Sequence, residues 1–163
     1  MFLVSHSLDI REKEVRSWIP EHPSIALVVA AVYFEWTLCR AIVGLSHRPN
    51  IDVRKDLERT YGLAGYKDIW RRETAHWPEA KTLPQIAKNW HEITKAFEGR
   101  NELVHGRERY TQKMVRPGID AILAGVRDIC AYSMGRGVDL NRRLPQRRRK
   151  KLTRSGLKNI FGA

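Results

Sequence analysis

The sequence predicts an all-α protein: a bundle of four to five helices with a basic C-terminal extension. Apolar side chains recur at steps of three, four or seven over several long stretches, which is the spacing of one face of an α-helix. No stretch alternates convincingly between apolar and polar residues, and the Asn-Gly pairs typical of hairpin turns are missing. At 163 residues, the chain is long enough for one domain whose helices bury their apolar faces against one another.

Two helices are predicted in the first 50 residues. The first, over residues 8–19, is short, carries Asp9 near its positive end and stops at Pro20. The second covers residues 24–46 and can be capped by Ser24. Because its apolar face is nearly continuous, we expect this second helix at the centre of the bundle.

Glu35 and Arg40 interrupt the apolar face of that central helix. An unpaired charge is costly to bury, so each side chain either reaches solvent at an exposed edge or pairs with a polar group and orients a site. The two charges also break the apolar run well short of a membrane span, and the charged residues soon after Met1 do not suit a signal peptide. We therefore expect a cytoplasmic protein without membrane contact.

Peripheral elements are predicted before residue 82. A modest helix over residues 51–57 is followed by a loose turn at Gly62 and Gly65, and then by a short element over residues 66–70. The next segment mixes basic and aromatic side chains, which form either a surface that stacks bases and neutralises phosphates or a solvated loop. Its members are Arg71, Arg72, His76 and Trp77.

Two strong helices are predicted in the second half of the chain. Thr82 opens the first, with Pro84 in its first turn, and apolar residues continue at helical spacing to Val104. The second covers residues 110–134, where Pro117 is an early irregularity and the later apolar positions suit a core helix.

Positive charge gathers at the C-terminal end. Residues 137–163 hold nine Lys or Arg against one Asp, which is +8 of the formal net charge of +12. The sequence therefore predicts a helical domain over residues 1–136 and a basic tail over residues 137–163 that is flexible or ordered by a partner. A charge of this size implies a polyanionic partner such as nucleic acid. The nucleic-acid contacts predicted in the tail are Arg147, Arg148, Arg149, Lys150 and Lys151.

Neither a metal nor a cofactor is expected. Cys39 and Cys130 are the only cysteines, too few for a disulfide framework and not in a metal-ligand spacing. The histidines are scattered, and no cluster of His, Asp and Glu has the spacing of a metal site.

Arg100 and His105 stand five positions apart inside an otherwise apolar helical pattern. Cleavage of RNA by its own 2′-hydroxyl needs a base, an acid and a cation near the pentacovalent phosphorane. A histidine can fill either proton role, and a guanidinium can grip two phosphate oxygens at once. Five residues on an ideal helix leave the two side chains about 140° apart, so arginine's length or a distortion near Gly99 must close the gap. Because one histidine cannot be acid and base at once, a two-fold dimer would supply both.

Two neighbours support this pair. Gly106 suits a helix C-cap, which would put the His105 imidazole at the negative end of the helix dipole. Asn101 is polar on the side of the apolar stripe, so it either hydrogen-bonds and orients Arg100 or His105, or it caps the helix and packs against a backbone carbonyl.

Arg100-Asn101, His105 and Gly106, set between two long helices, resemble the signature of the HEPN superfamily (higher eukaryotes and prokaryotes nucleotide-binding). The wider stretch over residues 100–111 looks like the prokaryotic branch often labelled RiboL-PSP-HEPN. Some members carry a tyrosine two residues after the histidine, where this chain differs. The residues of this stretch predicted to contact RNA are Arg107, Arg109 and Tyr110.

The resemblance implies a helical bundle that dimerises and cuts RNA without a metal, with Arg100, Asn101 and His105 at the catalytic site. Such proteins are typically toxins or defence nucleases, and a cognate antitoxin or nucleotidyltransferase is a partner that the resemblance suggests. Some HEPN proteins have lost activity. The alternative is therefore a catalytically inactive HEPN module that binds nucleic acid or a partner protein.

Overall fold

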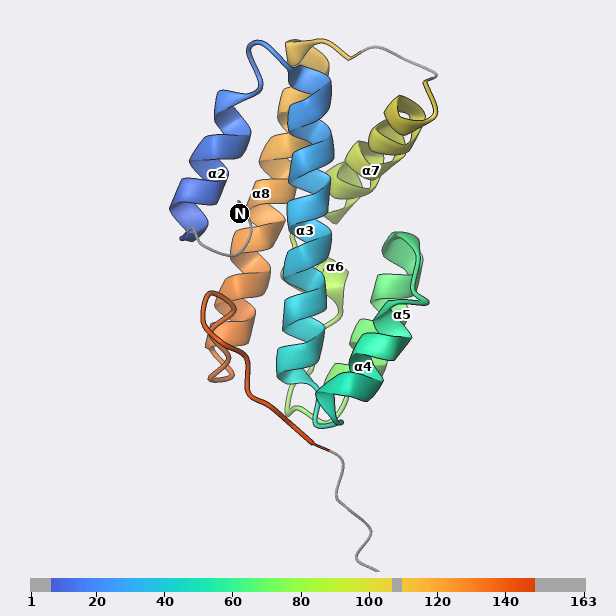
Figure 1. Ribbon diagram of the computed structural model, residues 1–163, viewed down its shortest axis with the longest axis vertical. Helices are drawn as coiled ribbons and strands as arrows, with labels where there is room; N and C mark the ends of the chain where they lie inside the picture. Colours follow the sequence, from blue (N-terminus) through green and yellow to red (C-terminus); the bar gives the residue numbers. More distant parts are fainter. Residues whose placement is uncertain (1–6, 107–109, 149–163) are drawn as a thin grey trace, which may run out of the picture.

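The computed structural model describes residues 7–106 and 110–148 (Figure 1). This part of the chain contains seven helices and no strand, so the all-α prediction is confirmed. The helices outnumber the four to five expected, because a predicted turn is helical and one predicted helix is split in two. They are α2 (Leu8–Ser17), α3 (Pro23–Leu45), α4 (Asn50–Leu57), α5 (Gly62–Thr74), α6 (Leu83–Ile86), α7 (Trp90–Val104) and α8 (Gln112–Met134).

Two long helices form the centre of the bundle. α3 and α8 run in the same direction and share the most extensive interface between described elements (Figure 1). α2 flanks this pair on one side and α7 on the other, both running in the opposite direction. α8 continues through Pro117 as a helix. The central position predicted for α3 is confirmed, and its fully buried side chains include Tyr33, Phe34, Leu38 and Ile42.

Among the described helices, only α3 is long and apolar enough to cross a membrane by length and composition. In its most apolar stretch, 56% of the residues are buried inside the protein. The core helix of a soluble protein meets the same criterion, so this property does not decide where the protein resides.

Small residues bring α7 close to α8 and α3. A Cβ atom on Gly118 of α8 would lie 2.8 Å from the Cβ of Ala96 on α7. A Cβ atom on Gly125 would lie 2.8 Å from Ile93 Cδ1 and 2.9 Å from Phe34 Cε2. Because interiors are close-packed, these contacts fix the position of α7, which carries Arg100, relative to α3.

α5 occupies the region where the sequence predicted a loose turn and a short element. Gly62 has φ +66°, as a turn residue would, but the helix begins at this residue and continues through Gly65. The glycines therefore obscured a pattern that is helical in spacing. Its buried members are Tyr66, Ile69, Trp70, Glu73 and Thr74.

The helix expected from Thr82 onward is two helices. Thr82 opens α6 as predicted, and its backbone N–H donates to Gln85 Oε1 at 2.8 Å. The backbone of Ala87 is extended (φ −82°, ψ 93°), which ends α6. Asn89, a residue type that favours the N-cap position, then precedes α7.

The packed chain continues past residue 136, where the sequence predicted the basic tail to begin. Gly137 has φ +75°, and the backbone N–H groups of Gly137 and Val138 donate to Met134 and Ser133, which is a Schellman ending of α8. The chain then turns back onto α3, where a Cβ atom on Gly44 would lie 2.6 Å from Val138 Cγ1. Buried side chains hold this segment to the core: Val138, Leu140 and Leu144.

Candidate functional site

The stretch that resembles the HEPN motif lies at the C-terminal end of α7. His105 is the C-cap residue of this helix, and Gly106 has φ +67°. In this left-handed conformation Gly106 donates its backbone N–H to Leu103 O at 3.0 Å and closes the last turn. The helix end predicted at Gly106 is confirmed.

Glu35 of α3 holds the guanidinium of Arg100. Arg100 Nη2 lies 3.0 Å from each carboxylate oxygen of Glu35. The side chain of Arg100 is 23% exposed and that of Glu35 is 26% exposed, so water screens the pair only partly. Of the two roles that the sequence left open for Glu35, the structure selects pairing with a polar group.

Burial raises the pKa of Glu35 above its usual value, and the charge of Arg100 opposes this rise without cancelling it. The ionised carboxylate therefore costs more to bury than the ion pair returns. The two contacts of Glu35 nevertheless hold the guanidinium of Arg100 against α3.

Asn101 is the second side chain that accepts a hydrogen bond from the guanidinium of Arg100. Arg100 Nη1 donates to Asn101 Oδ1 at 3.1 Å, which is the contact expected of an orienting residue. Asn101 itself is exposed, however, and not part of the buried stripe on which the sequence placed it. The guanidinium carbon lies 5.5 Å from the centre of the Phe97 ring. Arg100 Nε is buried and has no hydrogen-bond partner among the described residues.

These side chains border a pocket of about 560 Å³ between α3, α5 and α7. Among the described residues that line it, Arg100 is the only basic one, and the two carboxylates are Glu35 and Glu98. The far wall comes from the start of α5 and includes Tyr61 and Tyr66. The described lining of this pocket therefore carries no excess positive charge.

His105 does not line this pocket. Its side chain is exposed at the end of α7. Within residues 7–106 and 110–148, no side-chain hydrogen bond joins His105 to Arg100 or Asn101, although its backbone N–H donates to Asn101 O at 3.1 Å, as the helix requires. α7 is helical through Gly99, so no distortion closes the angle of about 140° between the two motif side chains. Within the described residues, Arg100 and His105 therefore share neither the pocket nor a side-chain hydrogen bond.

Gly99 makes room for Tyr110 rather than bending the helix. A Cβ atom on Gly99 would lie 3.0 Å from the Tyr110 hydroxyl oxygen. That hydroxyl donates to Glu102 Oε2 at 2.6 Å. Tyr110, predicted to contact RNA, therefore packs against α7, while the predicted contacts Arg107 and Arg109 lie outside the described residues.

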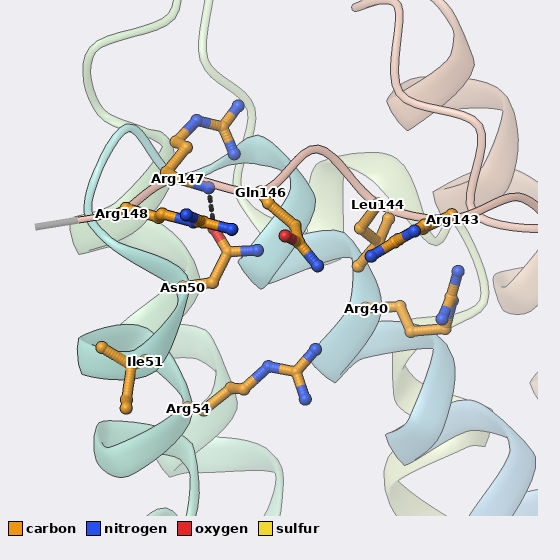
Figure 2. Close-up of a pocket in the computed structure, with 9 residues that line it drawn as sticks. All are labelled: Arg40, Asn50, Ile51, Arg54, Arg143, Leu144, Gln146, Arg147 and Arg148. Atoms are coloured by element: carbon orange, nitrogen blue, oxygen red, sulfur yellow. Dashed lines mark hydrogen bonds between the residues drawn. The ribbon is translucent and has the colours of Figure 1, made fainter.

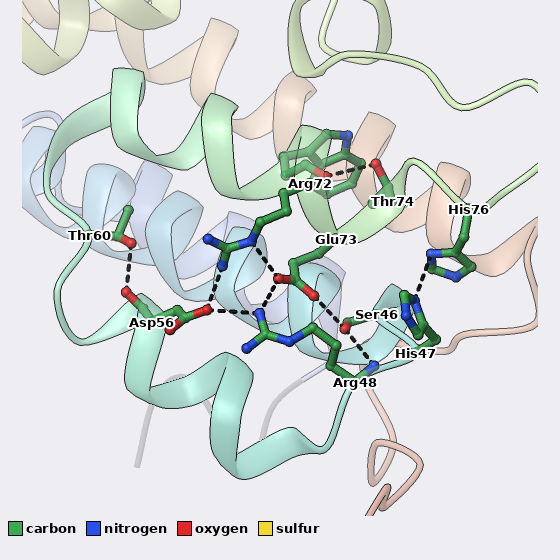
Figure 3. A network of polar contacts seen from close by, with 10 residues as sticks. Ser46, His47, Arg48, Asp56, Thr60, Arg72, Glu73, Thr74 and His76 are labelled. Atoms are coloured by element: carbon green, nitrogen blue, oxygen red, sulfur yellow. Dashed lines mark hydrogen bonds and ion pairs between the residues drawn. The ribbon is translucent and has the colours of Figure 1, made fainter.

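The mixed basic and aromatic segment after α5's midpoint belongs to a polar network (Figure 3). Glu73 Oε1 accepts from Arg48 at 2.7 Å and from Arg72 at 2.9 Å, and Glu73 Oε2 accepts from the Ser46 hydroxyl at 2.6 Å. Both arginines also contact Asp56, at 2.8 and 2.5 Å. The solvated loop, one of the two alternatives for this segment, is wrong for Arg71 and Arg72, which lie on α5 because the residues up to Thr74 are helical. His76 and Trp77 do lie in a turn after this helix.

The aromatic residues beyond α5 also have structural partners. Trp77 Nε1 donates to Leu45 O at 2.8 Å. His76 Nδ1 lies 3.2 Å from His47 Nδ1, with the two rings edge to face (Figure 3). These contacts bind the loop to the end of α3, so the alternative of a base-stacking surface gains no support.

Arg147 and Arg148 line a second pocket, of about 700 Å³, between the end of α3, the start of α4 and the C-terminal segment (Figure 2). Arg40, Arg54 and Arg143 line the same pocket. The sequence identified only two of these five arginines, because the other three are brought beside them by the fold. The remaining predicted contacts, Arg149, Lys150 and Lys151, lie outside the described residues.

No group of three or more His, Cys, Asp or Glu side chains in the described part of the chain is arranged to hold a metal ion. Cys39 and Cys130 are free thiols, and burial raises the pKa of both. Thiols of this kind are poor nucleophiles.

Comparison of the chain with protein-family models, with curated proteins and with solved structures finds no match. Membership of the HEPN superfamily therefore stays a prediction from the motif between Arg100 and Gly106.

The partner of Arg100 is the main site residue that the sequence did not identify. A signal for it exists, since Glu35 is a carboxylate within an apolar helix. Its pairing with a residue 65 positions later depends on how α7 packs against α3, and spacing along the chain does not reveal that.

Proposed function

We propose that this protein is a metal-independent endoribonuclease of the HEPN superfamily that acts as a homodimer. One observation carries the proposal: Glu35 and Asn101 orient the guanidinium of Arg100 on a helix that ends at the exposed His105. A fixed cation and a side chain that can take and give protons near neutral pH are the groups that this chemistry needs.

In the proposed reaction the 2′-oxygen of the RNA attacks the adjacent phosphorus, and the bond from phosphorus to the 5′-oxygen breaks. His105 of one copy accepts the proton of the 2′-hydroxyl, and His105 of a second copy gives a proton to the leaving 5′-oxygen. Arg100 neutralises charge on the phosphorane oxygens. The products are a 2′,3′-cyclic phosphate and a free 5′-hydroxyl.

The surface around the motif supports the pairing of two copies. Val104, directly before His105, is 63% exposed although it is apolar. Ile25 and Val32 are also exposed, and their spacing of seven residues puts them on one face of α3. A second copy that covers Val104 would lie against the neighbouring His105.

In this proposal the protein works in the cytoplasm of a prokaryotic cell as a toxin or defence nuclease. RNA is its substrate, and an antitoxin or a nucleotidyltransferase is the partner that would control it. The motif supports this role, as does the formal net charge of +12, which favours binding to a polyanion.

The test compares the purified wild-type chain with His105→Ala, Arg100→Ala and His91→Ala on labelled RNAs in the presence of a chelator. His91 is an exposed histidine at the start of α7 and serves as the matched control. We expect the wild type and His91→Ala to leave 2′,3′-cyclic phosphate ends. Loss of His105 should slow cleavage at least about 100-fold, since general acid–base catalysis contributes that much.

Circular dichroism of His105→Ala should match the wild type, because His105 is exposed. Undiminished cleavage by this variant, or cleavage only after a divalent metal is added, would overturn the proposed mechanism.

A second candidate is a non-catalytic HEPN module that binds nucleic acid. The pocket lined by five arginines favours it. It predicts RNA binding that weakens steeply with salt, with no cleavage product at any protein concentration. Gel-shift and cleavage assays on the same RNA distinguish the two functions.

A further inference from the structure

The pocket at the end of α3 concentrates positive charge (Figure 2). Nine of the described residues line it, of which five are arginines and none is acidic. They come from three separate parts of the chain: α3, α4 and the segment after α8. The five are Arg40, Arg54, Arg143, Arg147 and Arg148.

Several arginines elsewhere in the described chain are paired with carboxylates. Ion pairs with carboxylates engage the guanidinium groups of Arg16, Arg48, Arg72, Arg100 and Arg127. Of the ion pairs found within residues 7–106 and 110–148, none uses any of the five arginines of the pocket. Their charges are left for a ligand from outside the described chain.

Two of the five arginines also build the pocket. Arg40 Nε donates to Leu140 O at 2.7 Å, and Arg40 Nη2 donates to Arg142 O at 2.5 Å. Arg147 Nη2 donates to Gly44 O at 3.2 Å, at the carbonyl end of α3. These bonds tie the C-terminal segment to α3, so the walls of the pocket are preformed.

Asn50 fixes the third wall. Its Oδ1 accepts from the backbone N–H of Arg147 at 3.0 Å, its own backbone N–H donates to Arg147 O at 3.0 Å, and its Nδ2 donates to Pro145 O at 2.9 Å. Both the backbone and the side chain of Asn50 thereby bond the start of α4 to the C-terminal segment. Preorganised walls reduce the ordering cost of binding.

The arginines of this region repel one another. Burial lowers the pKa of Arg40, and the positive charges of Arg11 and Arg54 lower it further, while the carboxylate of Asp139 opposes the shift only in part. A bound anion would relieve this repulsion. Guanidinium groups hold phosphate oxygens through charge-assisted, often bidentate hydrogen bonds.

We propose that this pocket binds the phosphate backbone of an RNA strand, at a place separate from the Arg100 pocket. That the phosphates belong to RNA rests on the proposed function. None of the described residues that line the pocket is aromatic, so these residues offer no ring on which a base could stack. Contacts of this kind hold the strand without reading its sequence.

The experiment measures the affinity of the full chain for a labelled single-stranded RNA by fluorescence anisotropy, in a chelator, with every chain carrying His105→Ala. In this background we compare Arg54→Gln/Arg143→Gln with Arg59→Gln/Arg71→Gln. The first pair lines the pocket and makes no side-chain hydrogen bond within the described residues. The second pair is exposed on a surface that also carries Asp56 and Asp68, and removes the same charge.

We expect the pocket pair to weaken RNA binding about tenfold or more, and to lower the slope of log affinity against log salt by about 1.4, as two lost phosphate contacts would. The control pair should change affinity about twofold at most. Equal losses in both pairs would mean that only net charge matters, and would overturn the proposal. So would tight binding of ATP or pyrophosphate that the pocket pair alone abolishes while RNA binding persists.

This result does not depend on cleavage, since no chain in the experiment carries His105. A protein that fails to cut RNA could still show the pocket effect, and a nuclease could lack it. Failure of the pocket and failure of the proposed function are therefore distinguishable.

Discussion

Glu35 and Glu73 are both carboxylates paired with arginine, yet their environments act in opposite directions. Burial raises the pKa of Glu35 and Arg100 does not fully compensate. Burial also raises the pKa of Glu73, but hydrogen bonds from Ser46, Arg72 and Arg48 outweigh it and hold this pKa below its usual 4.5. Compared with the unfolded chain, the native protein therefore favours the ionised form of Glu73 and disfavours the ionised form of Glu35.

We predict that Glu35→Gln leaves the free energy of unfolding at pH 7 within about 0.5 kcal/mol of the wild type, or raises it, because the variant removes a charge that is costly to bury. Cleavage of RNA should fall about tenfold through kcat, since Arg100 loses its anchor. Urea unfolding and steady-state kinetics measure the two effects. Glu98→Gln, in the same pocket, is the matched control and should change neither.

Glu73→Gln provides the opposite case. It should lower the free energy of unfolding at pH 7 by about 2 kcal/mol, because two guanidinium groups and a hydroxyl lose a charged acceptor. A lowered native pKa stabilises the fold above the unfolded value of 4.5, and this stabilisation is lost as pH falls below it. The variant should therefore lose less stability than the wild type below pH 4.5. A strong loss for Glu35→Gln, or none for Glu73→Gln, would contradict this account.

At the scale of elements, the contact between α7 and α8 depends on the absence of a side chain at Gly118. A Cβ atom there would lie 2.8 Å from Ala96 Cβ, and a β-carbon cannot move without its backbone. Gly135, at the end of α8, is the contrasting position. Its backbone is α-helical at φ −60°, and an added Cβ would approach nothing nearer than 3.6 Å.

Gly118→Ala is expected to destabilise the protein by about 1–2 kcal/mol, since overpacking outweighs the gain in helix propensity. Gly135→Ala should be neutral or stabilising by up to about 1 kcal/mol, because it restricts only the unfolded chain. Urea denaturation of both variants measures the difference. Equal effects would show that α7 and α8 can separate freely.

The same elements show how far the sequence could predict the fold. α3 and α8 were predictable because an apolar face at helical spacing over more than five turns has no competing explanation. α5 was not, since Gly62 and Gly65 are turn residues by type, and only burial of Trp70 and its neighbours reveals the helix. The split between α6 and α7 rests on the extended backbone of Ala87, a residue type that gives no local signal.

The candidate site was predictable only in part, for a related physical reason. The motif at the end of α7 and its terminal Gly106 are local in sequence, so rules of residue spacing and helix capping can predict them. Glu35 as the partner of Arg100, and Arg40 beside Arg54 and the C-terminal arginines, are contacts between distant segments. Packing decides these contacts, and one sequence does not specify them by pattern.

At the scale of the whole molecule, the motif and the basic pocket lie toward opposite ends of the bundle. The end of α7 is at one end in Figure 1, and the start of α4 is at the other. The Arg100 pocket has two carboxylates and one arginine, whereas the basic pocket has five arginines. In the proposed function, the basic pocket holds the RNA strand, and the surface with Arg100 and His105 cleaves it.

A site that needs His105 from two copies makes a quantitative prediction. When wild-type and His105→Ala chains are refolded together from urea in equal amounts, random pairing makes about one quarter of the dimers fully wild type. The total activity should then fall to about one quarter of that of the same total amount of wild-type protein. The control is wild-type protein refolded at half the concentration with no variant present, which keeps about half. A mixture that also keeps half would mean that each chain cuts by itself, so that a single His105 beside its own Arg100 would have to provide the whole site.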